Sequence, residues 1–249
     1  MSGATKQVGF TIIETMLFLG ITGLIMSFML VGIGTQLNQR RYQDASTSLM
    51  TYVENQYNLV SNVNSSRTSS EVCIDNQITT TEIPQDNDAG RGTSDCSIVG
   101  RLLRSTDGGR AISSTPVIAT VDAATLPLTV GDSDVKVLHD ASLALGLEPE
   151  QYATKWGTSL VQPSPDNDKE ATFSILLVRM PTSGAIRTYV SSSETISLSD
   201  LVDGTNAADF RLCLSPGGLL GFDNRPTGIL MEAGASGPGQ VDFISQGGC

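Results

Sequence analysis

The strongest pattern in this chain is an unbroken apolar run near its amino terminus. Between Phe10 and Gln39 the only ionisable side chain is Glu14, and the apolar run reaches Gly34. About 25 residues at about 1.5 Å rise each give roughly 37 Å of helix, enough to cross a hydrocarbon core of about 30 Å. A carboxylate inside lipid is costly. Glu14 is therefore predicted either to lie at the membrane interface or to meet a positive partner.

From Thr35 onwards the pattern becomes amphipathic without a break. Apolar and aromatic side chains recur at helical spacing, and most charged residues fall off this stripe. The stripe comprises Tyr42, Ala45, Leu49, Tyr52/Val53, Gln56/Tyr57 and Val60. We expect one helix from Phe10 to about Asn62, roughly 80 Å long. Its second half, residues 35–63, is expected to lie against a globular head formed by residues 64–249.

The remaining chain predicts a head of mixed structure. Residues 64–115 are rich in Ser, Thr, Asp, Asn and Gly, and we interpret them as a polar connector. Apolar runs predict strands at 117–121, 172–180, 186–190, 210–214 and 241–244, the second and third forming a hairpin. Short helices are expected at 133–145 and 149–156, with a further turn at 197–201. The expected fold class is α+β, a long N-terminal helix packed on a small antiparallel sheet with loop-rich connections.

Composition narrows the classes of function. The 249 residues carry a formal net charge of −11, which argues against non-specific nucleic-acid binding because such binding needs a basic face. Arg101, Arg104 and Arg110 leave open a local DNA-binding patch, although solvated surface arginines are the favoured interpretation. The single histidine, His139, is expected to be an ordinary helix residue. Without a second histidine or clustered cysteines, the sequence predicts no catalytic residue, no metal site and no cofactor.

One aromatic pair is a candidate for ligand binding. Trp156 and Tyr152 lie close enough in sequence to form a carbohydrate-stacking platform. Packing in a core or an interface is the favoured alternative for both rings.

The amino-terminal sequence resembles the processing site of type IV prepilins and type II secretion pseudopilins. A short leader, residues 1–9, ends in Val8-Gly9 and precedes Phe10, the Thr11-x-x-Glu14 spacing and the long apolar run. The resemblance implies that a membrane peptidase cleaves after Gly9 and N-methylates Phe10. Residues 10–34 would then be the transmembrane and filament-core half of the helix. A plain signal anchor is the alternative for this segment.

The same resemblance implies a role for Glu14. Its carboxylate would neutralise the Phe10 amine of the adjacent subunit and set the axial register of the filament, because a buried unpaired charge is heavily penalised. The alternative is an interfacial glutamate that favours its own helix N-terminus.

The function implied by the resemblance is structural and not enzymatic. The chain would be a pilin that polymerises through its N-terminal helix into a type IV pilus, for adhesion, twitching motility or DNA uptake. The alternative is a minor pilin, a pseudopilin or a tip adhesin that primes or caps the filament. Implied partners are further copies in a helical filament, the prepilin peptidase, an inner-membrane assembly platform and minor pilins, and a surface or DNA ligand stays open. The subunit would be a single-pass protein of the cytoplasmic membrane with its head outside, and extracellular after assembly.

Four cysteines complete the sequence picture. Cys73, Cys96, Cys213 and Cys249 allow three pairings, and disulfides are expected in an exported protein. We favour Cys73–Cys96 and Cys213–Cys249 because each closes a local loop, with four free thiols as the alternative. The second pair resembles the disulfide-bounded C-terminal loop of many pilins.

Overall fold

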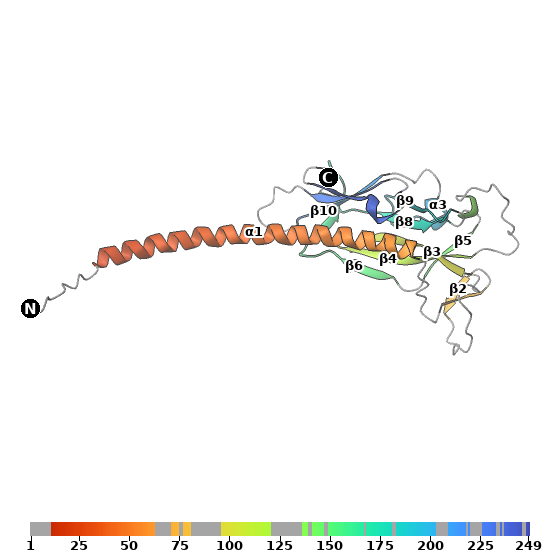
Figure 1. Cartoon of the computed structure of the whole chain (residues 1–249), viewed down its shortest axis with the longest axis horizontal. Coiled ribbons are helices and arrows are strands. Elements are labelled where there is room, and N and C mark those ends of the chain that lie inside the picture. Colours follow the sequence, from red (N-terminus) through yellow and green to blue (C-terminus); the bar gives the residue numbers. More distant parts are fainter. Residues whose placement is uncertain are drawn as a thin grey trace, which may run out of the picture.

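The chain forms a long helix that enters a β-rich head and leaves its own first half outside it (Figure 1). The computed structural model describes residues 11–62, 71–74, 77–80, 96–120, 136–138, 141–146, 149–166, 168–180, 183–202, 209–217, 219, 226–232, 235, 237–245 and 248–249, with the backbone alone at 31, 71–74, 77–80, 96–97, 120 and 142. Within these residues the fold is α+β, as expected.

Helix α1 spans Ile12–Ser61 and ends where the sequence predicted. Its last turn closes with the Asn62 N–H donating to the Asn58 carbonyl. The predicted stripe is confirmed, because its members are buried against the head, Tyr52 only partly, while the helix before Tyr42 is largely exposed. The period of the stripe matches the helix, so its second half alone can bury one face.

The described residues of the head form three antiparallel sheets. The largest has the order β5-β4-β3-β8-β9, with β6 also pairing with β4, and the second has the order β12-β11-β10-β7. A separate pair is formed by β1 (Glu71–Ile74) and β2 (Gln77–Thr80). The large sheet is built from β3 (Cys96–Thr106), β4 (Ala111–Thr120), β5 (Ser142–Leu145), β6 (Glu150–Ala153), β8 (Ser174–Arg179) and β9 (Ile186–Ser191). The second sheet is built from β7 (Ser159–Val161), β10 (Phe210–Ser215), β11 (Thr227–Met231) and β12 (Val241–Ile244), and the short helices are α3 (Leu198–Leu201) and η3 (Pro238–Gln240).

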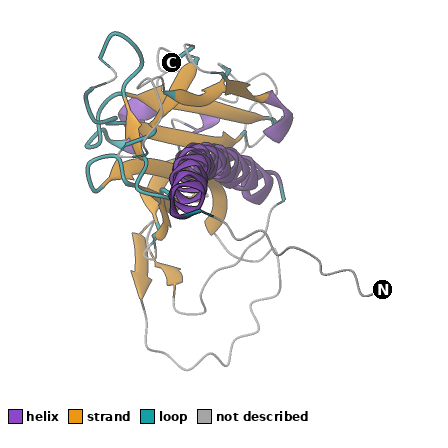
Figure 2. Ribbon diagram, turned by 90° about the vertical axis from the view of Figure 1, so that its left-hand side faces the viewer, coloured by secondary structure: helices purple, strands orange, loops and turns teal. Residues whose placement is uncertain are grey.

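Helix α1 lies across both large sheets, and Figure 2 shows the helix nearly end-on. The main core lies between them, and Tyr57, Leu103, Leu177 and Ile229 are among its buried members. A second core covers the far face of the large sheet and includes Leu176, with Leu201 from α3. Strand β8 supplies both cores because successive side chains of a strand point to opposite faces. Its continuous apolar run is therefore that of a strand buried on both sides.

Four polar side chains of α1 fix the helix to the head. The Tyr42 hydroxyl donates to the Leu214 carbonyl at 2.5 Å and accepts from the Thr227 N–H at 2.7 Å. Ser46, Gln56 and Tyr57 bond Thr227, Ser114 and Thr188 respectively. All of these groups are buried, where a lost partner leaves an unsatisfied polar atom that costs about 1–3 kcal/mol. The second half of the helix and the head therefore behave as one unit.

Three predictions about the head were wrong. The polar connector expected at 64–115 contains the longest strands, β3 and the start of β4, and β3 pairs with β4 on one side and β8 on the other. Gly100 permits the second pairing, since a Cβ there would collide with the Leu177 carbonyl. The helix expected at 149–156 is instead β6 and a turn, and the end of the helix expected at 133–145 is β5, with only 136–138 described as helical. Pairing with β4 decides both segments.

Most other strand predictions are confirmed. Strands β8, β9, β10 and β12 lie where the apolar runs placed them, β8 and β9 form the predicted hairpin, and α3 occupies the turn expected at 197–201. The strand expected at 117–121 is the second half of the longer β4.

Candidate functional site

The candidate functional site is the exposed half of α1 together with the base of the head where that half emerges. At its start, Thr11 is the N-cap and its hydroxyl accepts from the Glu14 N–H at 3.3 Å. Glu14 lies in the first turn, where a carboxylate favours the positive end of the helix dipole. The structure brings no described residue to Glu14 as an ion-pair partner. Gly9 and Phe10 lie outside the described residues, so cleavage, methylation and the charge pair stay predictions.

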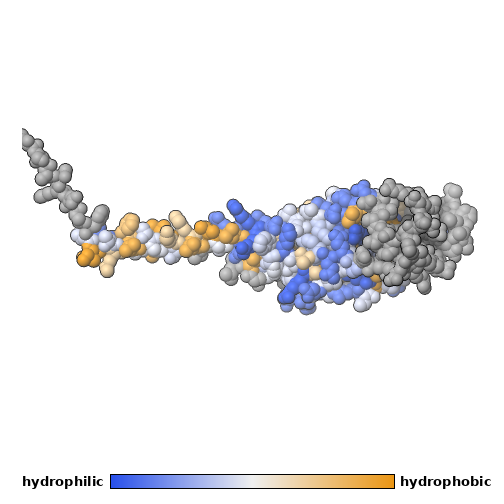
Figure 3. All heavy atoms as spheres, turned by 90° about the horizontal axis from the view of Figure 1, so that it is seen from below, coloured by the Kyte–Doolittle hydropathy of each residue, from blue (hydrophilic) through white to orange (hydrophobic). Residues whose placement is uncertain are grey.

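The first half of α1 exposes many apolar side chains, interspersed with residues of near-neutral hydropathy (Figure 3). Ile12, Ile13 and Phe28 are 78%, 80% and 72% exposed, and Leu37 near the end of this half is 48% exposed. Apolar exposure of this extent marks contact with a membrane or a protein. Among the described residues, α1 is the one helix long and apolar enough to cross a membrane.

The hydroxyl groups within this apolar half are satisfied by the helix itself. Thr15 donates to the Ile12 carbonyl, Thr22 to Phe18, Ser27 to Gly23 and Thr35 to Gly32, at 2.8–2.9 Å. A hydroxyl that bonds its own helix needs no water. This half of α1 can therefore enter lipid or a bundle of apolar helices without an unsatisfied hydroxyl.

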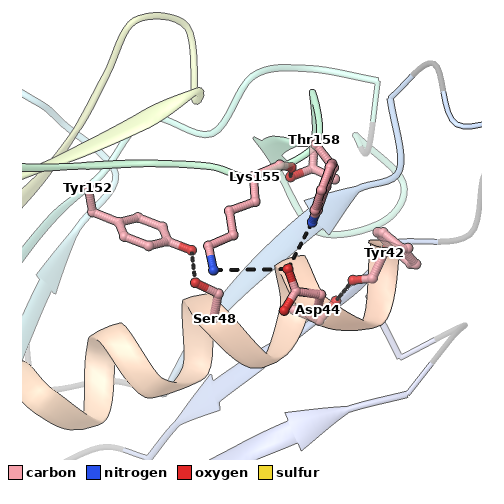
Figure 4. Close-up of polar contacts among 8 residues, drawn as sticks. Tyr42, Asp44, Ser48, Tyr152, Lys155 and Thr158 are labelled. Carbon is pink, nitrogen blue, oxygen red and sulfur yellow. Dashed lines mark hydrogen bonds and ion pairs between the residues drawn. The ribbon is translucent and has the colours of Figure 1, made fainter. Parts of the chain in front are cut away.

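The base of the head meets α1 through a polar cluster that Figure 4 shows in close-up. One oxygen of Asp44 accepts from the Trp156 indole N–H at 2.8 Å and lies 3.9 Å from the Lys155 ammonium. The Arg41 guanidinium lies 5.1 Å from the centre of the Trp156 ring, a cation–π distance. One turn further along α1, Ser48 accepts from the Tyr152 hydroxyl at 3.2 Å. The cluster joins the helix to β6 and to the segment between β6 and β7.

Sequence reasoning missed this cluster because it placed Lys155 and Trp156 in or beside a helix. In the structure they begin a turn in which both central residues, Trp156 and Gly157, have positive φ, 60° and 72°. Asp44 is one of the charged residues that fall off the apolar stripe, and nothing in its local sequence indicates a partner. The dipeptide Trp156-Gly157 was the available signal, since glycine at such a turn favours a tight reversal.

The aromatic pair does not form a shared platform. Tyr152 stacks on Tyr52 with ring centroids 4.4 Å apart, and its hydroxyl is bonded to α1. Trp156 instead contacts Arg41 and Asp44 and is 51% exposed. The favoured interpretation, packing, therefore holds for Tyr152, while Trp156 stays half exposed.

The tyrosines that attach α1 to the head ionise late. Burial raises the pKa of Tyr52 from 10.0 to about 12, with the nearby Glu150 charge adding to the effect. Burial also raises the pKa of Tyr42, Tyr57 and Tyr152 above the ordinary value. A raised pKa means that the folded chain keeps these protons at a pH where the unfolded chain has lost them.

We expect the head to lose stability steeply as the pH rises from 10 towards 12. Below pH 10 these tyrosines are protonated in both the folded and the unfolded chain, so they add no pH dependence to the free energy of unfolding. Above it each such tyrosine costs up to about 1.4 kcal/mol per pH unit. Urea unfolding followed against pH measures the slope, and Tyr52→Phe should reduce it while keeping the stacked ring. An unchanged slope in that variant would contradict the assignment.

The carboxyl end of the chain is tied into the second sheet. Cys213 of β10 and Cys249 form a disulfide, with their Cα atoms 5.7 Å apart. The Cys249 carbonyl also accepts from the Ser164 N–H at 2.6 Å. This confirms one of the two favoured pairings. The other, Cys73–Cys96, involves side chains outside those described.

The three arginines considered for DNA do not form one patch. Arg101 bonds Ser114 and pairs with Glu150 at 3.1 Å, whereas Arg104 points to the other side of β3 and donates to the Ile196 carbonyl. Arg110 lies in the β3–β4 turn. His139 lies outside the described residues, and in the part of the chain that the structure describes no group of three potential metal ligands occurs.

Comparison with known proteins gives no relative. No family model, no curated protein and no solved structure matches this chain. What the protein does is therefore inferred from its own residues and geometry.

Proposed function

We propose that this chain is a structural subunit of a helical filament of the type IV pilin or pseudopilin kind. One observation carries the proposal. A single 50-residue helix has a first half that is apolar and exposed and a second half buried in a head. An apolar surface that the head leaves exposed must be covered by lipid or by the same surface of other copies. Lipid covers this surface while the subunit is in the membrane, and other copies cover it after the subunit assembles.

The continuity of α1 supports a filament over a plain membrane anchor. The apolar half joins the half bonded to the head with no described break at any residue from Ile12 to Ser61. The buried bonds of Tyr42 and Tyr57 hold the second half to the sheets. Packing the exposed halves together would thus place the heads in a fixed array. A simple anchor has no need of this rigidity.

In this proposal the head lies outside the cytoplasmic membrane, and the prepilin peptidase acts at Gly9 and Phe10. An inner-membrane assembly platform and minor pilins would be the partners during polymerisation. The Cys213–Cys249 disulfide supports an exported head, because disulfides persist in oxidising compartments.

Mass spectrometry on filaments sheared from the source cells tests the proposal. An abundant peptide that begins at methylated Phe10 is expected for a major pilin. The same peptide at trace level would indicate a minor pilin or pseudopilin. A chain that still carries Met1 or Ser2 in the membrane fraction would refute processing and leave an ordinary anchored protein.

The glycines of α1 give a prediction about assembly. A Cβ added at Gly20, Gly23 or Gly32 would meet no atom of this chain within 4 Å, so none of the three is needed for packing within the subunit. At about 100° per residue, Gly20 and Gly23 share one side of the helix with Ser27, and Gly32 lies on the other side. Small residues on one side let helices approach closely.

Gly20→Leu and Gly23→Leu should lower filament yield severalfold, and Gly32→Leu should lower it less. Leucine is the better helix former by about 0.8 kcal/mol, so weakening of the helix cannot explain a loss. Sheared-filament yield against total membrane-inserted subunit measures the effect. Equal yields from all three variants would contradict close packing on this side.

A further inference from the structure

We propose that the base of the head, through a basal collar of Arg40, Arg41, Lys155 and Trp156, rests on anionic phospholipid headgroups while the subunit is in the membrane. This rests on the membrane-inserted stage of the proposed function and adds a partner to it. Arg40 and Arg41 come from α1, and Lys155 and Trp156 come from the turn between β6 and β7.

The length of α1 places the collar at the membrane surface. From Glu14 to Gly34 the helix rises about 30 Å, the thickness of the hydrocarbon core. The polar headgroup layer adds about 5–7 Å on each side, which corresponds to residues 35–38. Arg40 and Arg41 follow at once, and Tyr42 is the first residue of α1 that the head buries. The head therefore begins where the headgroups end, within reach of long cationic side chains.

Trp156 has the features of an interfacial aromatic residue. It is half exposed, and its polar N–H is held by Asp44 while the Arg41 guanidinium lies over its ring. Its positive φ of 60° is a conformation that an L-residue other than glycine, asparagine or aspartate rarely adopts. A turn of this kind needs no indole for its backbone. Tryptophan is enriched at membrane interfaces because its ring is apolar with one polar edge.

The charges of the collar favour an anionic surface. Of its three cations, Lys155 is beside Asp44, whereas Arg40 and Arg41 form no ion pair within the described parts of the chain. The adjacent β3–β4 turn carries Asp107 and Arg110, which offset one another, and the Glu170 carboxylate lies against Gly108 of the same turn, so that the three cations of the collar face two nearby unoffset carboxylates, those of Asp44 and Glu170. The net charge of the whole chain is −11, so its overall charge opposes contact with an anionic membrane. Arg40, Arg41 and Lys155 leave the collar with an excess of positive charge that such a surface attracts.

Trp156 is also the only tryptophan of the chain, so its fluorescence reports on the collar alone. The full chain would be reconstituted at high dilution in vesicles of phosphatidylglycerol and phosphatidylcholine that contain lipids brominated either near the glycerol or near the chain end. We expect strong quenching by the shallow bromines, weak quenching by the deep ones, and less access to aqueous iodide than in detergent. In pure phosphatidylcholine the shallow quenching should fall.

Charge variants separate the collar from the anchor. The head either contacts the membrane surface or stands away from it. The double variant Arg40→Gln, Arg41→Gln should shift this equilibrium away from contact by up to about 25-fold, since each arginine near an anionic surface contributes about fivefold. The matched control is Arg187→Gln. Arg187 is an exposed cation of β9, and its neighbour Ile186 pairs with Arg179, which donates to the Ser61 carbonyl at the end of α1 far from the collar. It should leave quenching unchanged.

Two outcomes would overturn the inference. The first is equal quenching of Trp156 by iodide in vesicles and in detergent, with no quenching by either brominated lipid. This would show that the head does not contact the membrane. Shallow quenching that appears only at high protein-to-lipid ratio would mean that a second copy covers the collar. Neither result affects filament assembly, whereas a chain that fails to float with the vesicles would contradict the membrane stage of the proposed function itself.

Discussion

Glu14→Ala is expected to abolish filaments while leaving the subunit cleaved and inserted in the membrane. In the proposed filament the carboxylate meets the Phe10 amine of a neighbouring copy among apolar helices. Removing one partner of a buried pair leaves an uncompensated charge, which costs about 3–5 kcal/mol. A loss of that size at every contact stops growth. Electron microscopy and the yield of sheared filaments, set against the amount of processed subunit in membranes, measure the effect.

Two variants determine whether the charge is responsible. Glu14→Gln keeps the shape of the side chain and should fail as Glu14→Ala does. Glu54→Ala, which removes a carboxylate from the second half of α1, should assemble normally. The start of the helix should survive in both Glu14 variants, because Thr11 is bonded by the backbone N–H of Glu14 and not by its carboxylate. Normal filament yield from Glu14→Gln would contradict the assembly role.

Replacing both Cys213 and Cys249 by serine is expected to lower the free energy of unfolding of the head by roughly 4 kcal/mol. The disulfide closes a loop with a sequence separation of 36 and so restricts the unfolded chain. Both cysteines are buried, and the Cys249 sulfur lies close to Gly228, where a Cβ would clash with it. Guanidinium unfolding followed by circular dichroism, without reductant, gives the difference.

The double variant avoids leaving a free thiol that could pair elsewhere. Ser245→Ala, an exposed change near the same terminus, is the matched control and should change the midpoint little. The wild-type midpoint in the double variant would show that the final residues are held by other contacts. The bond from Ser164 to the Cys249 carbonyl is the first of these to consider.

The sequence alone was sufficient for α1. Its backbone bonds join residues four apart, so the apolar run, the change of pattern at Thr35 and the stripe from Tyr42 to Val60 contain the information that the helix needs. The apolar character of the first half of α1 can also be read from the run itself, because it depends on no other segment of the chain. The role of Glu14 and the cleavage at Gly9 rest on the resemblance and await the experiments above.

The tertiary structure decided the parts of the head that local patterns misassigned. Whether 142–145 and 150–153 become strand depends on β4, a partner distant in sequence, and pairing there outweighs local helix propensity. The same holds for β3, where Arg101 donates to Ser114, Ser114 donates to Gln56 of α1, and Ser105 donates to Glu194. The contact of Asp44 with Trp156 spans 112 residues. Local periodicity therefore determined the helix and its apolar surface, while long-range pairing determined the sheets and the collar at the base of the head.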